Sequence, residues 1–407
     1  MYSPSQAWAV QIAAVSACWP GSSYDPGTSD RHPDPKAAKR GLTGCSNCTR
    51  LLAHEKRRYV MTPDQFEIAV RAVEDFPTKS ESCEPRRGRK NKIVGIFGGE
   101  PLLSPYFPEY VEILCASVPA KNRGLWTSFD WRIYEHPKWG PALPHVTRLF
   151  GRAPRSGEPW ADGEGYLNWN MHEEDQHCEH QPLLVAIQDV VKDEKKRWDL
   201  IDQCWLNRDW SPAVALDAQN EVKFYFCEVA AAFDRVFDLG TGLPPEPGCW
   251  EGDLQMIRDE RGVLRPHGKF AQQVLSTCGR CGVALPWKRG RRDRDWKDDV
   301  SPSNLIPLQQ VGSPMVKRGD VVEFGDEQIA AYDVSNNLEG WVPETYVKRL
   351  SRTSTGGKVF EKGLRRKPRW KPGGLIRGRL GKLLREWSQR WAAPRQAPPR
   401  PPRSSSS

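Results

Sequence analysis

Short apolar runs alternate with helix signals through the first half of the chain. Strand-like runs occupy residues 9–15, 93–97 and 124–129, and residues 166–170 are a fourth candidate. Between the first two runs, Thr62 and Pro63 mark a helix start, with Gln65 completing a capping box. Apolar residues at helical spacing predict a further helix over 107–118. This alternation is typical of an α/β protein with a parallel sheet.

The composition supports a folded chain of two or three domains. The chain has 407 residues, of which 38% are hydrophobic, and 17 tryptophans add large apolar surfaces. That content excludes wholesale disorder. An ordinary transmembrane helix is also excluded, because no apolar run reaches the roughly 18 residues that a membrane crossing needs.

The positive charge of the chain is concentrated at its end. The net charge is +9, but residues 348–407 hold 18 lysines and arginines against only Glu361 and Glu386. The first 347 residues therefore carry −7, from 42 basic and 49 acidic residues. An acidic body gives no electrostatic reason to bind a polyanion, so we expect no nucleic acid at the core.

Eleven cysteines and two Cys-x-x-Cys pairs indicate metal or redox chemistry. An odd count in a long chain without a convincing secretion signal does not suggest a disulfide framework, so we expect a reducing, cytoplasmic location. Residues 15–18 also fit a bacterial lipoprotein cleavage site. Against this alternative, residues 1–14 contain no lysine or arginine, and Gln11 interrupts the apolar stretch.

Three elements in order carry a family resemblance. The first strand ends at Cys18, Cys45-x-x-Cys48 follows in the next loop, and the second strand runs into Gly98-Gly99-Glu100-Pro101. In this combination the sequence resembles the radical SAM superfamily. The resemblance implies a partial (β/α)6-type TIM barrel in which Cys18, Cys45 and Cys48 hold a [4Fe–4S] cluster. It also implies binding of S-adenosylmethionine by Gly98, Gly99, Glu100 and Pro101, with Thr127, Ser128 and Asn170 as further contacts.

The sequence departs from the family pattern at the first ligand. The family has Cys-x3-Cys-x2-Cys, which requires a cysteine at position 41, where this chain has Gly41. Cys18 precedes Cys45 by 26 intervening residues, so we interpret residues 19–44 as an insertion in the cluster loop. Loop closure costs little more for a longer loop, so the insertion is tolerable. A catalytically inactive descendant and a zinc pair at Cys45 and Cys48 remain alternatives.

A second group of cysteines follows a predicted hairpin over 213–226. It resembles the auxiliary iron–sulfur domain of many radical SAM enzymes (SPASM, or its shorter twitch form), although Asn220 and Glu221 stand where that pattern has a glycine. The resemblance implies a second cluster, with Cys178 as a competitor for the first ligand position. Four thiolates on a structural zinc are the alternative. The expected ligands are Cys204, Cys227, Cys278 and Cys281.

We therefore expect a radical SAM core over residues 1–205, with a Pro/Gly-rich surface insertion at 136–164. An auxiliary cysteine-rich domain over 206–300 follows, then an extension of short strands and turns over 301–350 and a basic, largely disordered tail over 351–407. Within the tail, residues 374–391 predict a basic amphipathic helix suited to an anionic membrane surface or an acidic partner.

The resemblance implies an enzyme that cleaves S-adenosylmethionine reductively and abstracts hydrogen from a substrate that the sequence does not identify. Such an enzyme takes electrons from an external donor such as flavodoxin or ferredoxin. The sequence names no catalytic side chain beyond the cofactor-binding residues. The alternative class is a zinc-stabilised binding protein that acts through its basic tail.

Overall fold

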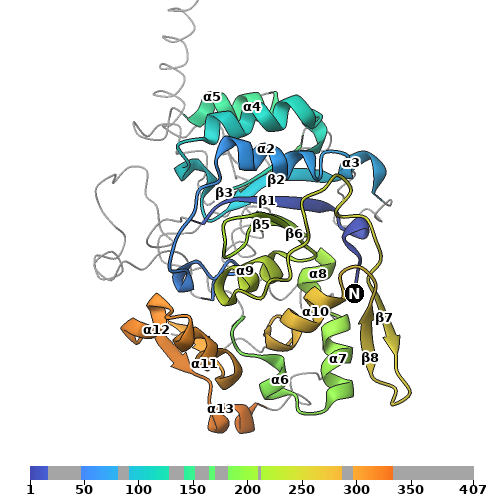
Figure 1. Ribbon diagram of the computed structural model, residues 1–407, viewed down its shortest axis with the longest axis vertical. Helices are drawn as coiled ribbons and strands as arrows, with labels where there is room; N and C mark the ends of the chain where they lie inside the picture. The colour runs from blue at the N-terminus through green and yellow to red at the C-terminus, as the bar shows by residue number, and fades with distance from the viewer. Residues whose placement is uncertain are drawn as a thin grey trace, which may run out of the picture. The chain divides into compact units, whose positions relative to one another are not determined.

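Figure 1 shows the computed structural model of the chain. The structure describes residues 1–16, 47–80, 91–127, 142–151, 165–169, 182–209, 212–286 and 297–332. The expected insertion at 19–44, the basic tail and its amphipathic helix lie outside the described residues. So do five residues singled out from the sequence: Cys18, Cys45, Ser128, Asn170 and Cys178.

A six-stranded, mostly parallel sheet forms the centre of the fold, which confirms the α/β class. The strands lie in the order β4-β3-β2-β1-β5-β6, and the pairing of β5 with β6 is antiparallel. β1 therefore lies inside the sheet, with β2 on one side and β5 on the other. The strands are β1 (Ala9–Val15), β2 (Ile93–Gly98), β3 (Arg123–Thr127), β4 (Tyr166–Trp169), β5 (Ala213–Leu216) and β6 (Val222–Tyr225).

The two central strands are apolar because both of their faces are covered. Every residue of β1 and β2 is buried, which explains why these segments are largely continuous apolar runs and do not alternate with polar residues. Their register runs from Ala9 opposite Ile93 to Ala13 opposite Phe97, and then shifts so that Val15 lies opposite Gly98.

Helices α2 (Pro63–Arg71), α4 (Phe107–Ser117) and α5 (Leu143–Phe150) lie on one face of the sheet (Figure 1). The predicted capping box of α2 is confirmed: Gln65 N–H donates to Thr62 Oγ1 over 3.2 Å, and Thr62 N–H donates to Gln65 Oε1 over 3.0 Å. Phe66 of α2 stacks on Tyr110 of α4 with ring centroids 4.4 Å apart.

Helix α5 lies within the 136–164 segment, where we expected only a Pro/Gly-rich surface insertion. Val146, Leu149 and Phe150 are buried, and α5 packs against α4. The prolines and glycines around this stretch obscured a helix of eight residues whose apolar face completes the layer.

The opposite face of the sheet is covered by α9 (Glu228–Phe237), which follows the predicted hairpin of β5 and β6. All ten residues of α9 are buried. In the hairpin turn, Asn220 has a φ of 65°, a conformation that glycine favours and asparagine tolerates better than most residues. This explains how the chain makes the turn without the expected glycine.

The hairpin that we assigned to an auxiliary domain over 206–300 belongs to the central sheet. β5 pairs directly with β1, and the described residues all fall within one compact unit that extends to Glu361. The remaining elements before residue 300 are α6 (Ile187–Val190), α7 (Glu194–Asp202), α8 (Trp205–Asp209), β7 (Gln255–Arg258), β8 (Leu264–His267) and α10 (Ala271–Thr277).

The following segment contains more helix than the strands and turns we expected. Ser301 and Ser313 each precede a proline at a helix start, a combination that favours helix initiation. Its elements are β9 (Asp298–Val300), α11 (Pro302–Gln310), α12 (Pro314–Arg318), β10 (Val321–Glu323) and α13 (Asp326–Ala331).

Short 3₁₀ helices complete the described elements: η1 (Pro4–Gln6), η2 (Leu52–His54), η4 (Pro101–Leu103), η5 (Ala120–Asn122) and η8 (Cys278–Arg280). Within the described ranges, no helix combines the length and apolar content that a membrane crossing needs.

Gly98 is the tightest point of the sheet edge, and we predict that Gly98→Ala destabilises the fold. Its φ is +146°, and a Cβ there would lie 2.2 Å from the carbonyl oxygen of Val15. We expect a loss of roughly 2–4 kcal/mol in the free energy of unfolding, measured by urea denaturation. Gly151→Ala is the control, since its φ is +76° but nothing lies within 4 Å of the added carbon. It should cost only about 1 kcal/mol, and equal losses would contradict the steric argument.

Candidate functional site

The predicted site lies at the edge where the parallel strands β1, β2 and β3 end. Parallel sheets place ligands at this carboxyl edge. Gly98 and Gly99 turn the chain away from β2 there, and Gly99 N–H donates to the carbonyl oxygen of Val15 over 2.7 Å. The two glycines thus dock the turn directly onto the end of β1, close to where the chain continues toward Cys18.

The structure joins two residues that the sequence treated as separate cofactor contacts. Thr127, the last residue of β3, donates its hydroxyl to Glu100 Oε1 over 2.7 Å. The same oxygen accepts the backbone N–H of Leu102 over 3.1 Å, while Pro101 begins η4. Glu100 is fully buried. Its carboxylate is therefore held in a fixed orientation at the sheet edge.

Cys48 is the member of the first cysteine group that the structure describes. It stands in a tight turn in which Asn47 and Leu51 both have φ values of 51°. Burial raises the pKa of the Cys48 thiol to about 11, against the opposing effect of hydrogen bonds from the backbone of Arg50 and Leu52. A cation at the sulfur would be needed to make this thiol a thiolate at neutral pH.

Arg50 connects this turn to the rest of the site. Its guanidinium donates to the carbonyl oxygen of Glu228 over 3.1 Å and to the hydroxyl of Tyr59 over 3.4 Å. It also lies 5.8 Å from the ring centroid of Phe97, the residue before Gly98. Arg50 thereby brings the Cys48 turn, the end of β2 and the start of α9 together, although the sequence gives no sign of this role.

The segment after residue 297 holds the Cys48 turn from the other side. Asn47 N–H donates to Asp298 Oδ1 over 2.6 Å, and Asp299 N–H donates to Asn47 Oδ1 over 3.3 Å. His54 Nε2 lies 3.0 Å from Asp298 Oδ2, and His54 Nδ1 lies 2.9 Å from Ser313 Oγ. Both ends of the 47–54 turn are thus fixed by residues about 250 positions away.

His54, Asp298 and Ser313 have the composition of a nucleophilic triad, but their placement is structural. The side chain of His54 is 0% exposed and that of Asp298 is 3% exposed. Ser313 Oγ also accepts the N–H of Val316 and caps α12. A substrate carbonyl has no access to a serine that is buried and occupied in this way.

Glu55 is a buried carboxylate close to the same edge. Its nearest cation is Arg235, with 3.8 Å between Nε and a carboxylate oxygen, and neither oxygen accepts a hydrogen bond of normal geometry. Burial raises the pKa of Glu55 to about 7, and Arg50 and Arg235 oppose that rise only in part. Buried polar atoms without partners are uncommon, so this edge has the character of a site that binds a further group.

The structure brings the four cysteines of the second group together from three parts of the chain. Cys204 follows α7, Cys227 precedes α9, and Cys278 and Cys281 flank η8. Burial raises the pKa of Cys227 and Cys278 well above the usual thiol value, and the neighbouring thiols of the group raise it further. The pKa of Cys281 is raised by burial and by Cys204.

The thiols of this group therefore lie within electrostatic reach of one another, with Cys227 and Cys281 buried and Cys204 and Cys278 partly buried. The donor set suits a metal that binds thiolates, such as zinc or iron in an iron–sulfur cluster. In the residues that the structure describes, however, no three His, Cys, Asp or Glu side chains converge closely enough to hold a metal ion. Binding would require these thiols to draw closer together.

Two of the cysteines outside both groups, Cys249 and Cys115, have structural surroundings. Cys249 is buried, with its sulfur 3.5 Å from the carbonyl oxygen of Ala72. Cys115 is half-buried on α4, with its sulfur 3.8 Å from the carbonyl oxygen of Arg148. Cys83 lies in the undescribed 81–90 segment.

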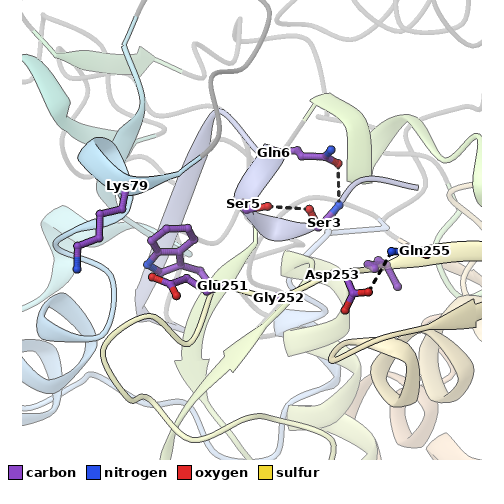
Figure 2. A pocket seen from close by; sticks show the side chains of 10 residues that line it. Ser3, Ser5, Gln6, Lys79, Glu251, Gly252, Asp253 and Gln255 are labelled. Carbon is purple, nitrogen blue, oxygen red and sulfur yellow. Dashed lines mark hydrogen bonds between the residues drawn. The ribbon is translucent and has the colours of Figure 1, made fainter.

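A hollow of about 550 Å³ lies at the opposite, amino edge of β1 (Figure 2). Residues of η1, Lys79 and the 250–255 segment line it. Several of its polar groups bond to one another, as Ser3 does with Ser5 over 2.8 Å and Asp253 with Gln255 over 3.1 Å. This hollow is separate from the predicted site and contains none of its residues.

The chain was compared with known proteins. No protein-family model matches it. No curated protein matches it either.

The Asp298 carboxylate offers a direct test of how the Cys48 turn is held. Asp298→Ala leaves the buried N–H of Asn47 and the ring of His54 without their acceptor. We expect the free energy of unfolding to fall by roughly 2–4 kcal/mol, since a buried donor without a partner costs most of its desolvation penalty. Asp193→Ala is the control, because Asp193 caps α7 at an exposed position. That change should cost about 1 kcal/mol, and a smaller loss for Asp298→Ala would contradict the structure.

Glu55 should make the stability of the protein depend on pH. Its pKa is about 7 in the folded protein and near 4.5 when unperturbed. The folded state therefore binds more protons than the unfolded state between these values, and stability falls as the pH rises from 4.5 to 7. At about 1.4 kcal/mol per unit, the loss amounts to about 3 kcal/mol. Urea denaturation across this range should show a flatter profile for Glu55→Gln, and an unchanged slope would contradict the assignment.

Proposed function

We propose that the chain is a radical SAM enzyme. Under this proposal Cys18, Cys45 and Cys48 hold a [4Fe–4S] cluster, and the Gly98–Pro101 turn binds S-adenosylmethionine. The observation that carries the proposal is the contact through Arg50, which ties the Cys48 turn to Phe97 immediately before the two glycines. Two motifs that are 50 residues apart in the sequence thus meet at one sheet edge.

The fit of this edge to a cofactor rests on its unsatisfied polar groups and its open backbone. Neither carboxylate oxygen of Glu55 accepts a hydrogen bond of normal geometry, and Arg50 Nε has no partner. At Gly98 the missing Cβ allows the close packing of the turn on Val15, and Gly99 adds a second position without a Cβ where a ligand can approach the backbone closely. An ammonium group on the ligand would complement the carboxylate of Glu100.

When bound, the cluster and S-adenosylmethionine supply a 5′-deoxyadenosyl radical that abstracts hydrogen from a substrate. The residues of the chain bind and orient. Thr127 acts on the ligand through Glu100, because its hydroxyl already donates to that carboxylate. Ser128 and Asn170, outside the described residues, are the further proposed contacts. An external donor such as flavodoxin or ferredoxin would provide the electron.

We further propose that Cys204, Cys227, Cys278 and Cys281 bind an auxiliary cluster. Their gathering in buried and partly buried positions supports a shared ligand, because neighbouring thiols otherwise gain little from their proximity. The same gathering favours a second candidate function, a structural zinc in a binding protein or in an inactive descendant of the family. The partial (β/α)6-type barrel, with the auxiliary cysteines as an appended domain, belongs to the proposal as its finer description.

The basic tail is proposed to attach the enzyme to an anionic membrane surface or an acidic partner, with the body in the cytoplasm. The acidic body has no charge complementarity to nucleic acid.

Metal analysis after anaerobic purification distinguishes these functions. The radical SAM proposal predicts a brown protein that contains iron and sulfide in equal amounts and cleaves S-adenosylmethionine on reduction. Cys48→Ala and Cys18→Ala should each remove about half of the iron and abolish the cleavage. Cys115→Ala is the matched control, because this thiol is half-buried on α4 and belongs to neither group.

Two results would contradict the proposal. A colourless protein that holds only zinc would support the structural alternative. Cleavage that survives Cys18→Ala would show that Cys18 is not a ligand and that the insertion interpretation is wrong.

A further inference from the structure

Gln11 is a buried amide with no partner in the middle of the central sheet. Its exposure is 0%, and neither Nε2 nor Oε1 of its side chain makes a hydrogen bond. It lies on β1, between Gly95 of β2 and Ala213 of β5 in register. An amide left in this state is costly, because both a donor and an acceptor lose water without replacement.

The register identifies the face of the sheet to which Gln11 belongs. Partners in register share a face, so Gln11 projects on the same side as Ala213 and as Tyr225, which lies opposite Ala213. The hydroxyl of Tyr225 donates to Asp234 of α9 over 2.6 Å. Gln11 therefore faces the side of the sheet that carries α9, away from the layer formed by α2, α4 and α5.

The surroundings of Gln11 on this face are small on one side and aromatic on the other. Ala9, Ala13 and Ala213 share the face and are completely buried. Toward β3, the rings of Phe97 and Trp126 stand on the same face, with centroids 6.1 Å apart in an edge-on arrangement. Small residues beside an aromatic wall favour a flat ligand, and the amide supplies its hydrogen bonds.

The position also relates Gln11 to the proposed cofactor edge. Phe97 carries the Arg50 guanidinium over its ring and immediately precedes Gly98. Gln11 lies on the same face, four residues before the end of β1, and thus deeper in the sheet than the Gly98–Pro101 turn. A ligand at Gln11 would lie beneath the place where we put S-adenosylmethionine.

The geometry points to Gln11 as a recognition residue for a planar substrate group that presents a hydrogen-bond donor beside an acceptor. A primary carboxamide and the lactam edge of a nitrogen heterocycle have this pattern, and each pairs with a glutamine amide through two hydrogen bonds. The identification of this ligand as the substrate rests on the proposed function. The binding site itself rests on the unpartnered amide and the face that surrounds it.

The first experiment measures stability without added ligand. Gln11→Met and Gln11→Leu replace the amide by apolar groups of similar size, so both variants should shift the Tm upward. Thr241→Val is the control, since the buried hydroxyl of Thr241 also lacks a partner but lies in another part of the fold. A downward shift in both Gln11 variants would overturn the inference, because it would mean that the amide is already satisfied.

The second experiment measures binding of nicotinamide, a flat ring with a primary carboxamide, to the full-length chain by saturation-transfer NMR. The wild-type protein and Thr241→Val should bind nicotinamide, and Gln11→Met should bind it at least tenfold more weakly. Methyl nicotinate lacks the N–H donor, so its binding to the wild type should be no stronger than that of nicotinamide to Gln11→Met. No binding to the wild type, or equal binding to Gln11→Met, would overturn the inference. Neither measurement needs a cluster. A protein without iron would therefore contradict the proposed function but would leave the test of the Gln11 site valid.

Discussion

The buried guanidinium of Arg50 is the interaction on which the arrangement of the site depends. A cation removed from water is tolerated only when its donors make hydrogen bonds. Arg50 donates two, to the carbonyl oxygen of Glu228 and to the hydroxyl of Tyr59. Because it follows Cys48 by two residues and lies over Phe97, these bonds fix the cysteine turn against both the sheet edge and the start of α9. The same bonds link the Cys48 turn to the segment that begins after Cys227.

The charges around Arg50 form a connected system. Arg235 holds the carbonyl oxygen of Arg57 over 2.9 Å and lies over the ring of Tyr59 at 5.0 Å, while its Nε faces Glu55. From the other direction, Asp298 secures Asn47 and His54. The described end of the loop between β1 and α2, from residue 47 onward, is thus fastened by α9 and by the segment after residue 297. Such long-range fastening suits a loop that presents ligands in a fixed geometry, as the proposed function requires.

The sequence predicted much of the fold because the fold depends on local patterns. The apolar runs of β1 and β2 are buried on both faces, and the capping box at Thr62 starts α2 as expected. Helix α5 was missed because the surrounding prolines and glycines dominate the pattern of 136–164. The pairing of β5 with β1 was also missed, since the partner of a strand in a parallel sheet is not encoded in the strand itself. As a result, the hairpin that precedes Cys227 extends the sheet that carries the Gly98–Pro101 turn.

By itself, the sequence determined the α/β class, the two cysteine groups and the Gly98–Pro101 turn, all of which are local in residue type and spacing. Only the tertiary structure decided which of these residues meet. It paired Thr127 with Glu100, gathered Cys204, Cys227, Cys278 and Cys281, and left the amide of Gln11 buried without a partner. The physical reason is that desolvation and hydrogen-bond satisfaction depend on neighbours that are distant in the chain, and no pattern of nearby residues specifies them.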